Sequence, residues 1–178
     1  HGYRATFMPK PFSSLTGSGC HVHISLWDGS TNLFEKDAGD LGISKLGYNF
    51  IGGLIHSADA LCALTNPTVN SYKRINAPRT VSGATWAPNT VTYTGNNRTH
   101  MIRVPDPGRF ELRLPDGSAN PYLLQAGILA AGLDPFEVDR EMERKAKLAA
   151  KATFKVVAQE WLAKCEKEGR APITLHKQ

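Results

Sequence analysis

A glycine-rich turn that runs directly into an alternating hexapeptide constrains the fold of this chain most. Residues 17–19 are Gly-Ser-Gly, and residues 20–25 read Cys-His-Val-His-Ile-Ser. Because successive side chains of a strand point to opposite faces, the polar face consists of His21, His23 and Ser25. The small residues before the strand let the backbone turn sharply and bring its N–H groups close to an anion. The segment therefore predicts a strand with one polar face beside a possible anion site.

A second alternating segment carries charge of both signs. In residues 109–114 the polar positions are Arg109, Glu111 and Arg113, and the apolar positions are Phe110, Leu112 and Leu114. One strand face thus presents a positive, a negative and a positive group, which suits an anionic, metal-bound substrate. The pattern alone leaves alternatives to ligand binding open. The charged face would then be a structural ladder of salt bridges, and the two histidines of the first segment would be solvated.

Four blocks of sequence, in this order, resemble the glutamine synthetase family. The first, with Lys10-Pro11-Phe12, Thr16-Gly17-Ser18-Gly19, His21 and Ser25, is similar to the family's ATP-region signature. The later blocks are residues 66–74, which end in Tyr-Lys-Arg, residues 97–105, and the Arg-x-Glu-x-Arg strand at 109–116 with Ala-Asn-Pro-Tyr-Leu at 119–123. The resemblance covers about residues 4–134 and is nearest to a bacterial type III-like branch.

The resemblance implies an α+β fold. We expect the curved, mainly antiparallel sheet of the glutamine synthetase catalytic domain, backed by helices near residues 46–64 and 120–132. Residues 1–134 would form the catalytic-domain fragment and residues 135–178 a basic helical tail.

The resemblance also implies roles for individual residues. His21 and Glu111 correspond to ligands of a divalent metal, Mg or Mn, that bridges the phosphates of ATP. The expected ATP-binding residues are His23, Ser25, Arg98, Arg103 and Arg109. The expected glutamate-binding residues are Thr16, Gly17, Arg74 and Arg113, and the expected catalytic residues are Arg98 and Arg74.

The implied activity is that of a glutamate–ammonia ligase acting in glutamine biosynthesis and nitrogen metabolism. ATP would phosphorylate the side-chain carboxylate of glutamate, and ammonia would attack the γ-glutamyl phosphate. The family has a glutamate after the Tyr-Lys-Arg segment, whereas no carboxylate lies between Arg74 and Asp106 here. Trp86 in that stretch suits an alkylamine, as in a γ-glutamylmethylamide synthetase-type ligase, although simple loop packing would explain it equally.

The resemblance implies a homo-oligomer whose active sites lie between subunits. In the family, further metal-binding glutamates come from strands that precede the segment matched here, and an aspartate comes from the adjacent subunit. We therefore expect residues 1–178 alone to be inactive.

The segment after Asp134 differs in composition. Residues 137–178 hold ten of the 21 Lys and Arg against seven acids, which supplies +3 of the net charge of +5. The apolar residues Phe154, Val157, Ala158, Trp161 and Leu162 have helical spacing. Residues 153–164 and 170–175 resemble the start of the core-binding domain of phage-type tyrosine integrases, which predicts a DNA-binding fusion remnant; a divergent synthetase tail is the alternative.

Composition sets the remaining limits. A chain of 178 residues with 41% hydrophobic residues can bury one ordinary core. Its three cysteines are far apart, which argues against a disulfide framework or zinc site and favours the cytoplasm. The apolar run at 50–64 is interrupted by polar residues, so we expect no membrane association. The expected partners are small substrates, with nucleic acid contacted only through the tail.

Overall fold

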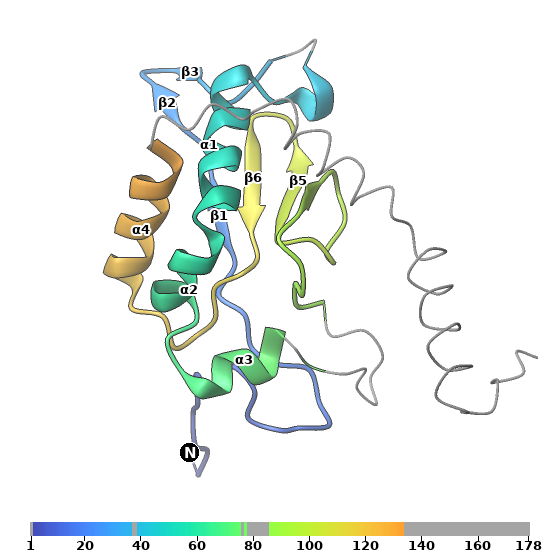
Figure 1. Ribbon diagram of the computed structural model, residues 1–178, viewed down its shortest axis with the longest axis vertical. Coiled ribbons are helices and arrows are strands. Elements are labelled where there is room, and N and C mark those ends of the chain that lie inside the picture. The colour runs from blue at the N-terminus through green and yellow to red at the C-terminus, as the bar shows by residue number, and fades with distance from the viewer. Residues whose placement is uncertain (1, 37–38, 76, 78–85, 134–178) are drawn as a thin grey trace, which may run out of the picture.

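The computed structural model describes residues 2–36, 39–75, 77 and 86–133. Within these ranges one mixed sheet is accompanied by helices that lie side by side (Figure 1). This confirms the predicted α+β class with a mainly antiparallel sheet. The predicted tail at 135–178 lies outside the described residues, so its helix and its integrase resemblance stay predictions.

The main sheet has four strands, and the strand that carries Glu111 lies inside it. The order is β1 (Val22–Ile24), β6 (Arg109–Leu112), β5 (Ile102–Asp106) and β4 (Tyr93–Thr94). Strand β6 pairs antiparallel with both neighbours, and β4 pairs parallel with β5. Glu111 is in register with His23 on one side and with Arg103 on the other. The pairing therefore brings polar groups from three strands to one face.

A small ribbon and a short helix connect the first strand to the helices. Strands β2 (Trp27–Asp28) and β3 (Thr31–Asn32) pair antiparallel. The 3-10 helix η1 (Asp40–Gly42) leads to Ser44, whose hydroxyl accepts a hydrogen bond of 3.1 Å from the N–H of Gly47. Since serine at this position satisfies one of the free N–H groups of a first helical turn, it defines where α1 begins.

The described ranges contain the α-helices α1 (Lys45–His56), α2 (Ala58–Thr65), α3 (Val69–Ile75) and α4 (Pro121–Leu133). The range expected to be helical at 46–64 is divided into two helices at Ser57, whose ψ is 8° and whose N–H bonds back to Gly53. Helices α1 and α2 both pack against α4 (Figure 1). No helix in the described ranges is long and apolar enough to cross a membrane.

Three phenylalanine rings form the centre of the core. Phe34, Phe50 and Phe110 lie with ring centroids 5.4 to 5.8 Å apart, and Phe34 and Phe110 are fully buried. Leu112 is also fully buried, so the predicted apolar face of residues 109–114 is confirmed. Burying this face stabilises β6 by about 25 cal/mol per Å² of apolar surface. Burial of the apolar face also places the charged side chains of β6 on the opposite face.

Candidate functional site

Glu111 is the centre of the charged face. Its side chain is only 5% exposed, yet it accepts hydrogen bonds of 2.7 Å from the guanidinium groups of both Arg103 and Arg113. Burial alone would raise the pKa of Glu111, but the bonds from the two arginines outweigh it and hold the pKa below its usual value. The carboxylate is therefore ionised near neutral pH. The salt-bridge ladder that the sequence left open is present in this structure.

His21 contacts the same carboxylate from β1's N-terminal side. Its Nδ1 lies 3.1 Å from Oε1 of Glu111 and 3.3 Å from Nη1 of Arg113. Burial, together with the charge of Arg113, lowers the pKa of His21 to about 4. The imidazole is therefore neutral at pH 7. In one tautomer Nδ1–H donates to the carboxylate of Glu111 across the 3.1 Å contact, and in the other Nδ1 accepts a hydrogen bond from Arg113.

These two side chains meet the first requirement for sharing a divalent ion. Two neighbouring ligands of an octahedral Mg ion, with bonds of about 2.1 Å, lie about 3 Å apart. The 3.1 Å between Nδ1 of His21 and Oε1 of Glu111 fits that spacing. Among the described residues no group of three or more His, Cys, Asp or Glu could hold a metal. His21 and Glu111 thus fit as part of a ligand set, and their role as metal ligands stays a prediction.

Arg74 is a buried cation at the end of α3. It is 3% exposed and donates hydrogen bonds to the carbonyls of Leu114 (2.9 Å) and Arg113 (3.1 Å). Burial lowers the pKa of Arg74, but a guanidinium stays protonated at any physiological pH. The two backbone bonds fix the plane of the guanidinium relative to the sheet.

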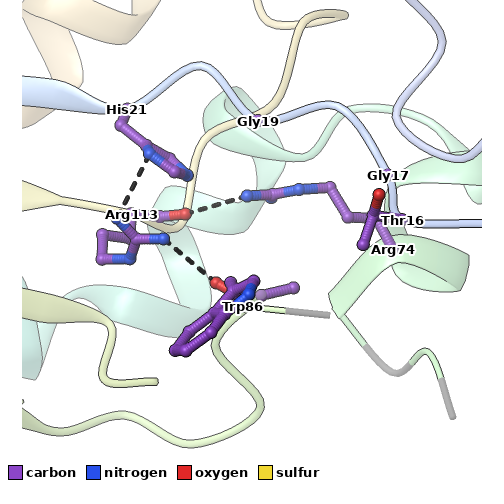
Figure 2. A pocket seen from close by; sticks show the side chains of 8 residues that line it. Thr16, Gly17, Gly19, His21, Arg74, Trp86 and Arg113 are labelled. Carbon is purple, nitrogen blue, oxygen red and sulfur yellow. Dashed lines mark hydrogen bonds between the residues drawn. The ribbon is translucent and has the colours of Figure 1, made fainter. Parts of the chain in front are cut away.

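A cavity of about 220 Å³ opens beside Arg74 (Figure 2). Its lining residues come from the glycine-rich turn, the residue before β1, helix α3, the loop before β4 and the residue after β6: Thr16, Gly17, Gly19, His21, Arg74, Trp86, Ala87 and Arg113. Arg113 connects these segments, since it donates hydrogen bonds to the carbonyls of Arg98 (3.0 Å) and Trp86 (3.2 Å). All four residues expected to bind glutamate therefore line one cavity.

The turn approaches Arg74 closely at two glycines. A Cβ at Gly17 would collide with the backbone carbonyl oxygen of Pro9 and lie 3.1 Å from Cγ of Arg74, so this position requires glycine. A Cβ at Gly19 would lie 2.6 Å from Nε2 of His21 and 2.8 Å from Nη2 of Arg74, so a larger residue there would displace the ends of these two side chains.

The expected ATP-binding residues lie outside the cavity lining. Arg109 bonds to Asp106 and lies 3.3 Å from Nδ1 of His23, whose other ring nitrogen is 3.9 Å from Glu111. The hydroxyl of Ser25 accepts a 2.9 Å bond from Trp27. Arg103 lies at Glu111, and Arg98 is exposed. Their roles toward ATP stay predictions.

Two buried polar residues beside the site received no role from the sequence. Asn66 and Asp116 are 1% and 0% exposed and bond to each other over 3.0 Å. Both lie in segments that carry the family resemblance, but a motif does not reveal which polar groups become buried. Only the packing of the α2–α3 connection against the end of β6 does so.

The fold and this face together are typical of a domain that holds anionic ligands beside a cation site. The chain belongs to the glutamine synthetase family: the family model for "Glutamine synthetase, catalytic domain" matches residues 1–167. The match continues past the boundary that we predicted at residue 134.

Curated relatives support the same family. A glutamine synthetase of Rhizobium meliloti (strain 1021) is 70% identical over 135 residues, which is 75% of this chain and 31% of the relative. A glutamate–methylamine ligase of Methyloversatilis universalis is 54% identical over 135 residues, which is 75% of this chain and 30% of the relative. The chain thus spans about a third of the length of the curated relatives that it matches.

Solved structures agree. A structure described as a GmaS/ADP complex superposes with a TM-score of 0.68 at 65% identity, covering 75% of this chain and 33% of that one. Glutamine synthetase of Plasmodium falciparum superposes with a TM-score of 0.63 at 36% identity, covering 73% and 25%.

Proposed function

We propose that this chain is the part of an ATP-dependent glutamate–ammonia ligase that holds the ATP phosphates and the substrate glutamate. The proposal includes a homo-oligomer, as the resemblance implies, acting in the cytoplasm, as the cysteine content favours. The proposal rests on one observation: Glu111 and His21 lie 3.1 Å apart beside a cavity that is lined by two buried arginines, Arg74 and Arg113.

Glutamate binding is proposed for the cavity. A guanidinium has five N–H donors in one plane, and the bonds from Arg74 to two carbonyls use only part of that capacity. Arg113 adds a second planar cation, while the turn at Thr16 and Gly17 supplies backbone at close range. Two cations in a small cavity suit the two carboxylates of glutamate.

ATP binding is proposed for the opposite end of the polar face. His23 and Arg109 contact one another there, near the exposed Ser25. Arg98 and Arg103 would add positive charge toward the same phosphates. Phosphoryl transfer depends mainly on positioning and charge stabilisation, which arginines provide without covalent chemistry.

His21 and Glu111 would hold part of the coordination shell of Mg or Mn. When bound, such an ion neutralises phosphate charge between the two substrates. The neutral His21 and the ionised Glu111 are in the protonation states that coordination requires.

Methylamine is the second candidate for the nitrogen nucleophile. Trp86 lines the cavity, no carboxylate lies between Arg74 and Asp106, and similar proteins include a glutamate–methylamine ligase. Sequence identity does not favour methylamine over ammonia, because the glutamine synthetase of Rhizobium meliloti is 70% identical to this chain and the glutamate–methylamine ligase is 54% identical.

Binding separates the two proposed subsites. The resemblance implies metal ligands beyond His21 and Glu111, so binding, not turnover, is the direct measurement on the 178-residue chain. We expect Arg74→Lys to weaken L-glutamate binding at least about tenfold with little change for MgATP, since lysine loses the planar, bidentate donor set. Arg109→Lys should do the reverse. Titration calorimetry measures both, and equal losses of both ligands in both variants would contradict the assignment.

A further inference from the structure

We propose that Asp116 is a positioning residue for Arg74, supplying its buried counter-charge and fixing the backbone carbonyl that orients its guanidinium. Asp116 does not line the cavity, and it is fully buried. The inference stands on contacts within the chain; only its consequence for glutamate rests on the proposed function.

The carboxylate of Asp116 receives three hydrogen bonds from neutral groups. Its Oδ2 accepts from Nδ2 of Asn66 (3.0 Å), and its Oδ1 accepts from the N–H (3.0 Å) and hydroxyl (2.5 Å) of Ser118. Its own N–H donates to the carbonyl of Thr65 over 3.2 Å. These bonds satisfy the oxygens, but neutral donors leave the negative charge itself uncompensated, which is costly in a buried site.

One carbonyl joins Asp116 to Arg74. Asn66, which Asp116 holds, donates a second bond of 3.0 Å to the carbonyl of Leu114. Arg74 donates its 2.9 Å bond to the same oxygen. The amide of Asn66 is itself oriented by the carboxylate of Asp116 and by the hydroxyl of Thr65, which donates a 2.7 Å bond to its Oδ1. Asp116 therefore helps to keep the Leu114 carbonyl aimed at Arg74.

The backbone around Asp116 is also held from the side of the glycine-rich turn. Asp116 forms an isolated β-bridge with Gly19, and the N–H of Cys20 donates to the carbonyl of Pro115 over 2.9 Å. Gly19 is the residue whose missing Cβ leaves room for Nη2 of Arg74. The same short segment therefore places both the carbonyl and the turn that confine the guanidinium.

The charges around Arg74 agree with this arrangement. Burial lowers the pKa of Arg74, the charge of Asp116 raises it, and the charge of Arg113 lowers it further. Glu111 is engaged by Arg103 and by Arg113 itself. Among the described residues, Asp116 is thus the carboxylate whose charge favours the buried Arg74.

A double-mutant cycle tests the link. We expect Asp116→Asn to lower the urea midpoint of the 178-residue chain, and to lower it at least about twofold less when Arg74→Met is already present. The reason is that the amide leaves Arg74 buried without its counter-charge, a cost that disappears with the arginine. A purely structural role for Asp116 would give equal shifts in both backgrounds, which would overturn the proposal.

Two further variants complete the design. Ser118→Ala removes a donor to Asp116 but keeps the charge, so its shift should be the same in both backgrounds. Asn66→Ala keeps the charge but breaks the link to Leu114, so its shift should again be smaller beside Arg74→Met. If Asp116→Asn does not fold, the Asn66→Ala cycle decides, and additivity there overturns the proposal.

Glutamate binding is measured separately from stability. We expect Asp116→Asn to weaken L-glutamate binding at least about fivefold and Ser118→Ala to leave it within about twofold, consistent with a coupling of a few kcal/mol or less between neighbouring polar groups. If the parent chain binds no L-glutamate while the stability cycle shows coupling, the proposed function fails and the positioning inference holds. If the cycles are additive while glutamate binding is normal, the positioning inference fails and the proposed function holds.

Discussion

The two ends of strand β6 carry the same kind of ion pair in different surroundings. At one end, Glu111 and Arg113 are 5% and 3% exposed in their side chains, and Arg103 joins them. At the other end, Arg109 and Asp106 are 44% and 57% exposed. Exposure determines how much each ion pair contributes to the free energy of unfolding. Water screens the outer pair, whereas the loss of one partner at the inner end leaves the other charge buried and unpaired.

The difference indicates that the two ends of β6 have different roles. The inner Arg113 is held by carbonyls and by Glu111, so it forms part of a rigid framework next to the cavity. The outer Arg109 contacts side chains that are themselves exposed, those of Asp106 and His23. This contrast supports the proposed assignment of the smaller ligand to the inner end and of the phosphates of the larger ligand to the outer end.

Glu111→Gln breaks the inner pair and should have the largest effect. The amide keeps the shape but leaves Arg103 and Arg113 without their shared anion, so we expect a loss of about 3–5 kcal/mol in the free energy of unfolding. Urea unfolding measures it, with Asp106→Asn as the matched control. A loss at Glu111 no greater than that of the control would show that burial does not distinguish the two ends.

Much of this contrast could be predicted from the residues, and part of it could not. The alternation of residues 20–25 and 109–114 predicted which side chains share a face, and the register of His23 with Glu111 agrees. The motifs placed Arg74 and Arg113 in one site, and the cavity contains both. Such local patterns are readable because the strand period is fixed by geometry.

The degree of burial could not be read from the sequence. Alternation gives the same polar pattern to Arg109 and Arg113, although their side chains are 44% and 3% exposed. The difference arises from the loops at Arg98 and Trp86, which accept hydrogen bonds from Arg113. Likewise, the sequence did not reveal that the helical range at 46–64 divides at Ser57, where α1 and α2 meet and both pack against α4.

The pH dependence of stability sharpens the comparison at the inner end. The pKa of His21 falls from 6.5 in the unfolded chain to about 4 in the fold, so the unfolded state binds the proton more readily. The stability that the neutral His21 contributes to the folded state is complete above pH 6.5, and it is lost progressively as the pH falls toward 4. Allowing for partial exposure, we expect a loss on the order of 1–2 kcal/mol by about pH 4.5.

His21→Asn isolates this contribution from the carboxylates that also titrate in acid. The difference in unfolding free energy between the parent and the variant should shrink by that amount between about pH 7 and pH 4.5. A constant difference between the parent and His21→Asn over this range would mean that the imidazole of His21 is not held neutral by the fold.

Asp106→Asn should have the smallest effect and the clearest salt dependence. Its partner Arg109 is 44% exposed, so water solvates the arginine when the carboxylate is lost, and we expect a cost of about 0–1 kcal/mol. Raising the salt concentration from about 0.1 M to 1 M shortens the screening length from about 10 Å to about 3 Å. The cost of Asp106→Asn should therefore fall toward zero in high salt, while that of Glu111→Gln should persist. Urea unfolding of both variants at the two salt concentrations measures this. A salt-insensitive loss above about 2 kcal/mol for Asp106→Asn would show that the outer ion pair behaves like the buried one.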